Sequence, residues 1–128
     1  MTNEEIITKL LDLPKNIKEA KEAVDGAQGL ISDNEKLISE KEAELMGTIL
    51  TERNGDEKLK YTNKESRDNA LILKKTADEG YKNLVSTKRK LESELLAAKN
   101  ELDLRLNTFS AVKYIADFTA SYFRIMSK

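Results

Sequence analysis

Apolar residues recur every seven positions through the first part of this sequence. Between residues 15 and 50, each member of an apolar series is followed three residues later by a small or polar residue. The two series are Ile17, Val24, Ile31, Ile38 and Leu45, and then Ala20, Ala27, Asn34, Lys41 and Thr48. This spacing is typical of a coiled-coil helix. It predicts a first helical arm over residues 15–50.

The same pattern returns after residue 64 and keeps its phase to residue 126. Its two series are Ala70, Ala77, Leu84, Leu91, Ala98, Arg105, Val112, Thr119 and Met126, and then Lys74, Tyr81, Lys88, Leu95, Leu102, Phe109, Ala116 and Phe123. We predict a second arm over residues 64–107 and an apolar C-terminal helix over residues 108–126. Gly80 lies inside the second arm, where glycine costs about 1 kcal/mol relative to alanine. A kink or a short break near residue 80 is therefore expected.

A short separate helix is predicted at the N-terminus, over residues 2–13. Thr2 and Glu5 have the spacing of a capping box, and Pro14 is expected to end the helix. The apolar residues of this segment are Ile6, Ile7, Leu10, Leu11 and Leu13. They could cover the apolar C-terminal helix, and a second subunit is the alternative cover.

The polar tip between the arms, residues 51–66, has the composition of a chain reversal. Asn54-Gly55 is the commonest dipeptide of a type I′ turn, so a small β-hairpin is one expectation and an irregular loop is the other. Helical structure restarts either with a capping box of Thr62 and Glu65 or with Asn63 capped against Ser66.

Folding the chain back at Glu57 and Lys58 gives a hypothetical register for the two arms. This register pairs Ile31 with Leu84, Val24 with Leu91, Ile38 with Ala77, and Ile17 with Ala98. It also places Lys41 against Lys74 and Asn34 against Tyr81. A shift by one heptad would preserve the periodicity, so the alternative register stays open.

The C-terminal helix carries most of the aromatic residues, and its apolar surface needs a cover. The candidate self-association residues are Phe109, Tyr114, Phe118, Tyr122 and Phe123. We expect a homo-oligomer, because a lone hairpin seldom buries such wide apolar stripes on both arms.

The tip also holds residues that turn geometry does not explain. The candidates for contact with phosphates or with an acidic protein surface are Arg53, Lys58, Lys60, Tyr61, Lys64 and Arg67. Further cations between Lys74 and Lys90 scatter around the second arm, and Lys74 and Lys88 fall on its apolar seam. A continuous stripe that could follow nucleic acid is therefore not evident.

Composition restricts the chemistry that the chain can perform. Charged residues make up 35% of the sequence, and histidine and cysteine are absent. The usual neutral-pH base, the thiol nucleophile and ordinary zinc sites are missing with them. We therefore expect no enzyme, no cofactor and no metal. No apolar run approaches the roughly 20 residues of a membrane span, so we expect a cytoplasmic protein.

Two families resemble parts of this organisation. The segments YTNKESRDNAL (61–71), KRKLESELLAAKNELDLRLN (88–107) and FSAVKYI (109–115) resemble small coiled-coil proteins of phages and prophages of Gram-positive bacteria. That resemblance implies an accessory protein of DNA metabolism or host takeover, in the host cytoplasm. The helix, hairpin, helix order also resembles a prefoldin β-type subunit, which implies a chaperone that holds unfolded clients.

The sequence thus predicts an all-α protein built on a long antiparallel coiled-coil hairpin, with a short N-terminal helix and an apolar C-terminal helix. The expected function is that of a non-catalytic, oligomeric adaptor or modulator that binds a protein partner. Direct nucleic-acid binding is one alternative, and a prefoldin-like chaperone is the other.

Overall fold

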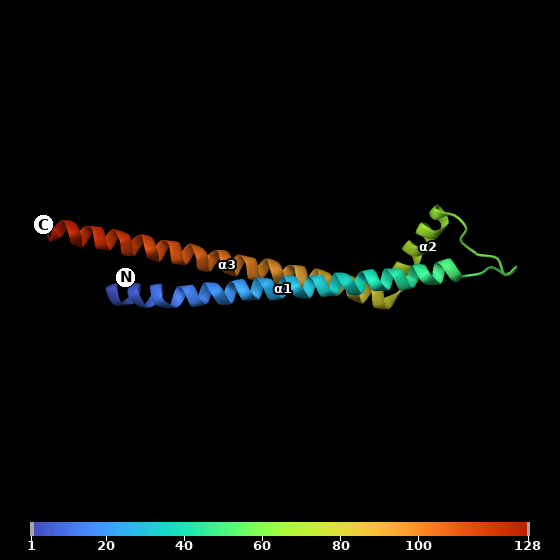
Figure 1. Ribbon diagram of the computed structural model, residues 1–128, viewed down its shortest axis with the longest axis horizontal. Helices are drawn as coiled ribbons and strands as arrows, with labels where there is room; N and C mark the ends of the chain where they lie inside the picture. The colour runs from blue at the N-terminus through green and yellow to red at the C-terminus, as the bar shows by residue number, and fades with distance from the viewer. Residues whose placement is uncertain (1, 128) are drawn as a thin grey trace. The chain divides into compact units, whose positions relative to one another are not determined.

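The computed structural model describes residues 2–127, and their regular structure is helical. The elements are α1 (Asn3–Thr51), α2 (Lys64–Ala77) and α3 (Glu79–Met126), shown in chain order in Figure 1. The predicted all-α class is confirmed. The chain forms two compact units: unit 1 comprises Met1–Gln28 with Ser93–Lys128, and unit 2 comprises Gly29–Glu92.

α1 is one helix, so the predicted separate N-terminal helix is wrong. The Thr2 hydroxyl oxygen accepts a hydrogen bond from the Glu5 backbone N–H at 3.1 Å, which caps the helix start as expected. Pro14 lies inside the helix and is exposed. A proline there removes a backbone hydrogen bond and costs about 3 kcal/mol. The helix continues because Leu13 and Ile17, on either side of the proline, are both buried.

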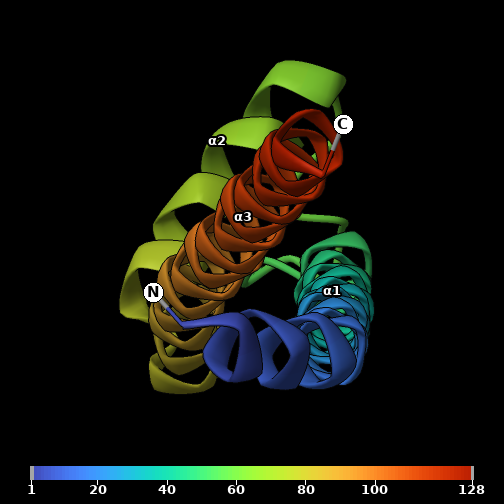
Figure 2. The same cartoon turned by 90° about the vertical axis from the view of Figure 1, so that its left-hand side faces the viewer.

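In unit 1 the first part of α1 packs against the last part of α3, and the two run in opposite directions (Figures 1 and 2). Ile6, Leu13 and Val112 form the buried cluster, with Val112 only 3% exposed. Leu10, Phe109 and Ala116 pack around it. The predicted cover of the C-terminal helix by the N-terminal segment is therefore present within the chain.

A polar contact crosses between the helices of unit 1. The Arg105 guanidinium donates from Nη1 to the Asn16 carbonyl oxygen at 2.6 Å and pairs through Nε with Glu101 at 2.8 Å. Arg105 occupies a seam position, and these two partners explain how a cation is accommodated on an otherwise apolar line.

Unit 2 combines a narrow apolar core with ion pairs between its helices. Its most buried side chain is Ile49, at 1% exposure. Three described ion pairs join α1 to later parts of unit 2: Lys41 with Asp78, Lys75 with Glu42, and Lys88 with Glu35. A fourth joins Lys74 of α2 to Glu52, the residue directly after α1. In unit 2, ion pairs between the helices thus supply part of the attraction that apolar burial supplies in unit 1.

The hypothetical register is wrong by one heptad. Lys88 pairs with Glu35 at 3.6 Å, and Tyr81 donates its hydroxyl to Glu42 at 3.3 Å. These contacts place Ile31 opposite Leu91, not opposite Leu84. The same shift holds in unit 1, where Arg105 bonds to the Asn16 carbonyl, whereas the hypothetical register would place Arg105 opposite Leu10.

Electrostatics favours the observed register. The hypothetical one would place Lys41 against Lys74, and like charges face to face are destabilising. In the structure Lys41 instead lies 3.5 Å from the Asp78 carboxylate, and Lys74 lies 3.8 Å from Glu52. Each lysine has gained an acidic partner, although exposed pairs of this kind contribute only about 0–1 kcal/mol each.

A break at Asp78 separates α2 from α3, which is the second of the two alternatives expected near residue 80. Asp78 is extended (φ −83°, ψ 114°), and its carboxylate accepts the Tyr81 backbone N–H at 2.7 Å. This bond, followed by the nearby Lys41 ammonium, lowers the pKa of Asp78 below its ordinary 3.8. A capping carboxylate therefore starts a new helix, and Gly80 falls in that helix's first turn. α3 then continues without interruption from Glu79 to Met126. The predicted boundary between a second arm ending at residue 107 and a separate C-terminal helix starting at residue 108 is therefore wrong.

The tip is a loop closed by a single antiparallel bridge between Arg53 and Leu59. The Glu57 N–H donates to the Asn54 carbonyl at 3.0 Å, and the Asn54 N–H donates to the Lys58 carbonyl at 2.8 Å. Glu57 has a left-handed φ of 60°, and none of the described glycines has a positive φ. This is a three-residue loop with a bulge, so the predicted type I′ turn is wrong.

α2 begins with one of the two caps proposed for it. Ser66 donates its backbone N–H to the Asn63 side chain at 2.7 Å, and the Asn63 N–H donates to the Ser66 hydroxyl at 3.4 Å. The Asn63 and Ser66 capping box is confirmed.

Candidate interaction surfaces

The five aromatic candidates for self-association divide into one core residue and four exposed residues. Phe109 packs against the buried cluster of unit 1. Tyr114 is 72% exposed and Phe118 is 64% exposed, and Tyr122 and Phe123 are each more than half exposed. The rings of Tyr122 and Phe123 meet edge to face, with centroids 6.0 Å apart. Four large aromatic side chains thus remain on the surface of a helix that is itself well formed.

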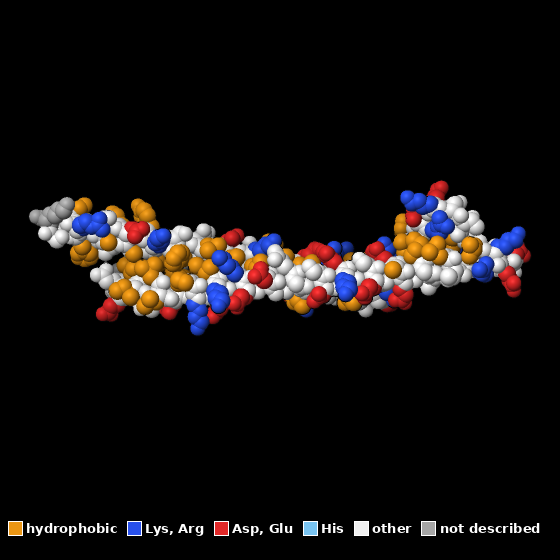
Figure 3. Space-filling view, in the orientation of Figure 1, with side chains coloured by type: hydrophobic (Ala, Val, Ile, Leu, Met, Phe, Trp, Pro, Cys, Tyr) orange, Lys and Arg blue, Asp and Glu red, His pale blue; other side chains and the backbone are white. Residues whose placement is uncertain are grey.

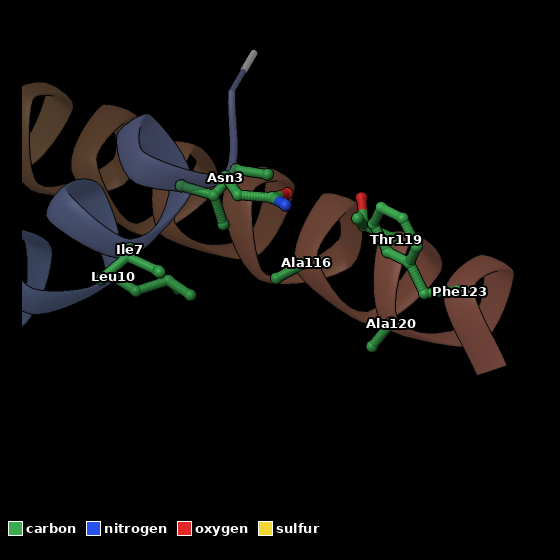
Figure 4. A pocket seen from close by; sticks show the side chains of 8 residues that line it. Asn3, Ile7, Leu10, Ala116, Thr119, Ala120 and Phe123 are labelled. Carbon is green, nitrogen blue, oxygen red and sulfur yellow. The ribbon is translucent and has the colours of Figure 1, made fainter. Parts of the chain in front are cut away.

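An apolar groove lies between the first turns of α1 and the end of α3 in unit 1 (Figure 4). Its volume is about 290 Å³. The lining residues are Asn3, Ile6, Ile7, Leu10, Ala116, Thr119, Ala120 and Phe123. Figure 1 shows that the end of α3 extends past the start of α1. Figure 3 shows hydrophobic side chains gathered over this part of unit 1.

The structure assigns two of the tip cations to local contacts. The Arg53 guanidinium donates to the Glu57 carbonyl at 3.1 Å. The Lys60 ammonium lies 3.6 Å from Glu52 and 5.4 Å from the centre of the Tyr61 ring. The Tyr61 side chain, followed by the Glu52 carboxylate, raises the pKa of Lys60. Arg53, Lys60 and Tyr61 therefore help to hold the loop.

The other three cations of the tip have no ion-pair partner among residues 2–127. They are Lys58 and Lys64, both exposed, and Arg67, which is half-buried. Since the contacts that shape the loop do not use their charges, these three are the better candidates for contact with an anionic surface.

A basic cleft that the sequence did not suggest lies at the corner between α2 and α3 in unit 2. Its volume is about 380 Å³, and its cations are Lys75, Lys82 and Arg89. Lys75 is held by Glu42 at 3.2 Å, and Lys82 by Glu79 at 3.5 Å. Sequence reasoning treated these cations as scattered around the second arm. The break at Asp78 brings α2 and α3 together at an angle that no helical periodicity encodes.

Two buried polar atoms in unit 2 have no hydrogen-bond partner within the described chain. They are Oδ1 of Asn34 and Oε2 of Glu52. Glu52 is compensated electrostatically, because Lys60 and Lys74 both lie within 4.0 Å of its carboxylate. Asn34 is 5% exposed and sits on the apolar seam. A polar seam residue of this kind costs stability and specifies helix register.

The described residues hold no cluster of three or more metal-ligating side chains. None of their helices has a stretch apolar enough, over a sufficient length, to cross a bilayer.

Comparison with protein families, with curated proteins and with solved structures gives no match for this chain.

Proposed function

We propose that this chain is a non-catalytic adaptor that works as an oligomer and binds a protein partner through the tip of unit 2. The observation that carries the proposal is the exposed apolar surface on the C-terminal part of α3. Exposed large apolar and aromatic side chains gathered on one helix are typical of interaction sites in proteins. The resemblance of roughly residues 15–115 to phage coiled-coil proteins extends the proposal to a partner in DNA metabolism or host takeover, in the cytoplasm.

Three features of the structure support this division of labour. The aromatic surface lies in unit 1, so it can serve self-association without involving the tip. The tip presents Lys58, Lys64 and Arg67, whose charges are free to meet an acidic protein surface. The tip loop itself is held by contacts of Arg53, Lys60 and Asn54 that do not use the side-chain charges of those three cations.

The test is a triple charge reversal at the tip: Lys58→Glu, Lys64→Glu and Arg67→Glu. Proteins captured from a lysate by the wild-type chain would be identified by mass spectrometry and compared with those captured by the variant. A partner is expected to be captured by the wild type and lost by the variant, while circular dichroism and oligomer mass stay unchanged.

The matched control reverses three exposed lysines of α1 in unit 1: Lys9→Glu, Lys18→Glu and Lys21→Glu. It changes the net charge by the same amount. The control should capture the same partner as the wild type. Capture that is equal for all three proteins contradicts a contact at the tip, and loss in both variants indicates a non-specific charge effect.

Direct nucleic-acid binding is a second candidate, favoured by the basic cleft of Lys75, Lys82 and Arg89. Phosphate contacts release counterions, so the affinity should fall steeply as salt increases. Gel shifts with single- and double-stranded DNA at two salt concentrations test this candidate. Absence of a shift at the lower salt concentration eliminates it.

A further inference from the structure

α3 carries a second heptad seam, separate from the one that packs on α1. The residues of its first seam, such as Leu102, Phe109 and Val112, are buried or half-buried against α1 in unit 1. A second set follows the same alternating steps of four and three, but is displaced around the helix by roughly a quarter turn. We call this set the outer seam: Ala97, Glu101, Leu104, Thr108, Ala111, Ile115, Phe118, Tyr122 and Ile125.

The outer seam is exposed along most of its length. Leu104 is 58% exposed, Phe118 is 64% exposed and Ile125 is 71% exposed. Apart from Glu101 near one end and the half-buried Thr108, its members are apolar or aromatic. From Leu104 to Ile125 it extends about 32 Å at 1.5 Å per residue. A helix with apolar seams on two sides is one that packs against two neighbours.

The spacing specifies what kind of neighbour fits. Alternating steps of four and three, sustained over four heptads, reach the length that a coiled coil needs and arrange side chains as knobs for the holes of another helix. A flat lipid surface or a globular partner would require only an apolar face, without this regularity. The outer seam is therefore shaped for a helix that itself carries heptads.

Charge points to a second copy of α3 as that helix. Between Leu104 and Ile125 the charged residues other than Arg105, which is held by Asn16 and Glu101, are Lys113, Asp117 and Arg124. At roughly 100° per residue, all three lie more than about 90° around the helix from the outer seam. Two identical outer seams can therefore meet without placing like charges together. An acidic or basic partner helix would find no opposite charge beside this seam.

The sizes of the side chains specify the direction of the second helix. In a parallel pair each residue meets its own copy, so Phe118 meets Phe118 while Ala111 meets Ala111. That arrangement alternates crowded layers with empty ones. An antiparallel pair can place the small Thr108 opposite Phe118 and the small Ala111 opposite Ile115, which gives layers of even volume, as close packing requires.

Glu101 favours the same direction. In a parallel pair the two Glu101 carboxylates would face each other across the seam, and like charges in that position are destabilising. In the antiparallel pair Glu101 lies opposite Ile125 at the end of the contact, far from its own copy and open to water.

We infer that two copies of this chain pair through the outer seams of their α3 helices, in antiparallel orientation about a twofold axis. This inference rests on the oligomer part of the proposed function and names its interface. The outer seam lies wholly within unit 1 and shares no residue with the tip of unit 2, so the two surfaces can be changed separately.

The first test is the mass in solution, by sedimentation equilibrium on the intact chain and on Phe118→Glu. The wild type should have twice the chain mass of 14.5 kDa. Phe118→Glu should have the mass of one chain, with unchanged helicity by circular dichroism. The matched control is Leu73→Glu on α2, which is as exposed, at 71%, and should remain a dimer. A monomeric wild type overturns the inference, as does a Phe118→Glu protein that still dimerises.

The second test distinguishes the two orientations by disulfide crosslinking. The chain has no cysteine, so Leu104→Cys and Tyr122→Cys each introduce a single thiol. In the antiparallel pair these two positions face each other, and an equal mixture of the variants should form mixed disulfide dimers under mild oxidation. Each variant alone should form few. The antiparallel orientation is overturned if each variant crosslinks efficiently with itself and the mixture forms no more mixed dimers than self-paired dimers.

These outcomes are separate from those of the adaptor test. A monomeric chain that still captures a partner through Lys58, Lys64 and Arg67 defeats the inference and leaves partner binding standing. A dimer that captures no partner does the reverse. A monomer that binds phospholipid vesicles through Phe118 overturns the inference in favour of a membrane surface.

Discussion

The two units use the same helical pattern but are held together by different forces. Unit 1 buries Ile6, Leu13 and Val112 between its helices. In unit 2 several positions along the contact are polar or charged, among them Lys41, the buried Asn34 and Lys88. The residues of unit 2 compensate through ion pairs between helices, whereas unit 1 depends on apolar burial.

This difference indicates a division between stability and specificity. Apolar burial is strong but permissive, because any heptad shift that keeps the period also keeps apolar residues together. Charged and amide positions contribute little stability but penalise wrong pairings. Unit 2 thus specifies which residues of the two arms face each other, and unit 1 supplies more of the free energy.

The largest expected effect comes from truncating the core of unit 1. Leu13→Ala should lower the free energy of unfolding by about 2–4 kcal/mol, because it leaves a cavity beside Val112. Leu11→Ala is the matched control, since Leu11 is 74% exposed and Leu13 only 8%. Urea denaturation of the two variants measures the difference. Equal losses would show that unit 1 has no distinct core.

Asn34→Leu should act in the opposite direction in unit 2. It removes a buried amide oxygen that lacks a hydrogen-bond partner, so the chain should become more stable by about 1 kcal/mol. The same change should weaken the choice of register, because a polar seam residue disfavours alternative pairings. The midpoint of thermal unfolding measures the first effect. A lower midpoint would show that the amide makes a contact on which unit 2 depends.

Glu57→Gly tests the backbone strain in the tip loop, where Glu57 has a positive φ. Glycine tolerates the left-handed φ of 60° that Glu57 adopts. We expect a gain of about 0.5–1 kcal/mol after the extra flexibility of the unfolded chain is included. The control is Gly55→Ala, because the φ of Gly55 is not positive and its Cβ would meet no atom within 4 Å. Destabilisation by Glu57→Gly would contradict the bulged loop.

The smallest expected effect is the pH dependence of the α3 start. The pKa of Asp78 is lowered in the folded state, so its contribution to stability is present above the ordinary value of 3.8. It is lost as the pH falls through the lower, folded value. Asp78→Asn keeps an acceptor for the cap but cannot titrate.

The measurement is the difference in thermal midpoint between wild type and Asp78→Asn. This difference should shrink as the pH falls below 3.8. Subtracting the variant removes the titration of the other carboxylates. A difference that does not change with pH would mean that the charge of Asp78 does not stabilise the cap.

Much of this fold could be predicted from periodicity alone. The seam positions follow directly from the heptad spacing, because a helix that buries one line must place residues such as Val24 and Leu45 on it. The sequence also predicted the cap of α2 at Asn63 as one of two alternatives, the other being a cap at Thr62. Such features depend on interactions between residues that are close in the sequence, so the sequence alone can show them.

The wrong predictions concern features that depend on contacts between segments far apart in the sequence. Pro14 was expected to end a helix, but Leu13 and Ile17 are buried on either side of it. The register could not be chosen from spacing, since apolar layers survive a shift by seven. The observed register includes the ion pair of Lys41 with Asp78. Asp78 is the extended residue at the break between α2 and α3, and spacing alone did not locate that break.

Four of the five aromatic residues of the C-terminal helix belong to two different heptad lines and Tyr114 lies on neither, although the sequence prediction treated all five as one apolar surface. Phe109 belongs to the seam that packs on α1, and Phe118 and Tyr122 belong to the outer seam. Spacing alone separates these two lines. What spacing could not decide is which line faces α1, because both are apolar and both keep the heptad period.

The account depends most on the observed register, in which polar residues select one heptad alignment from two. Cysteine crosslinking tests it directly, because the chain has no cysteine of its own. Under mild oxidation, Ile31→Cys combined with Leu91→Cys should form an intrachain disulfide efficiently. Ile31→Cys combined with Leu84→Cys should not. Efficient crosslinking of the second pair, with failure of the first, would contradict the register and the role given to Lys41 and Asn34.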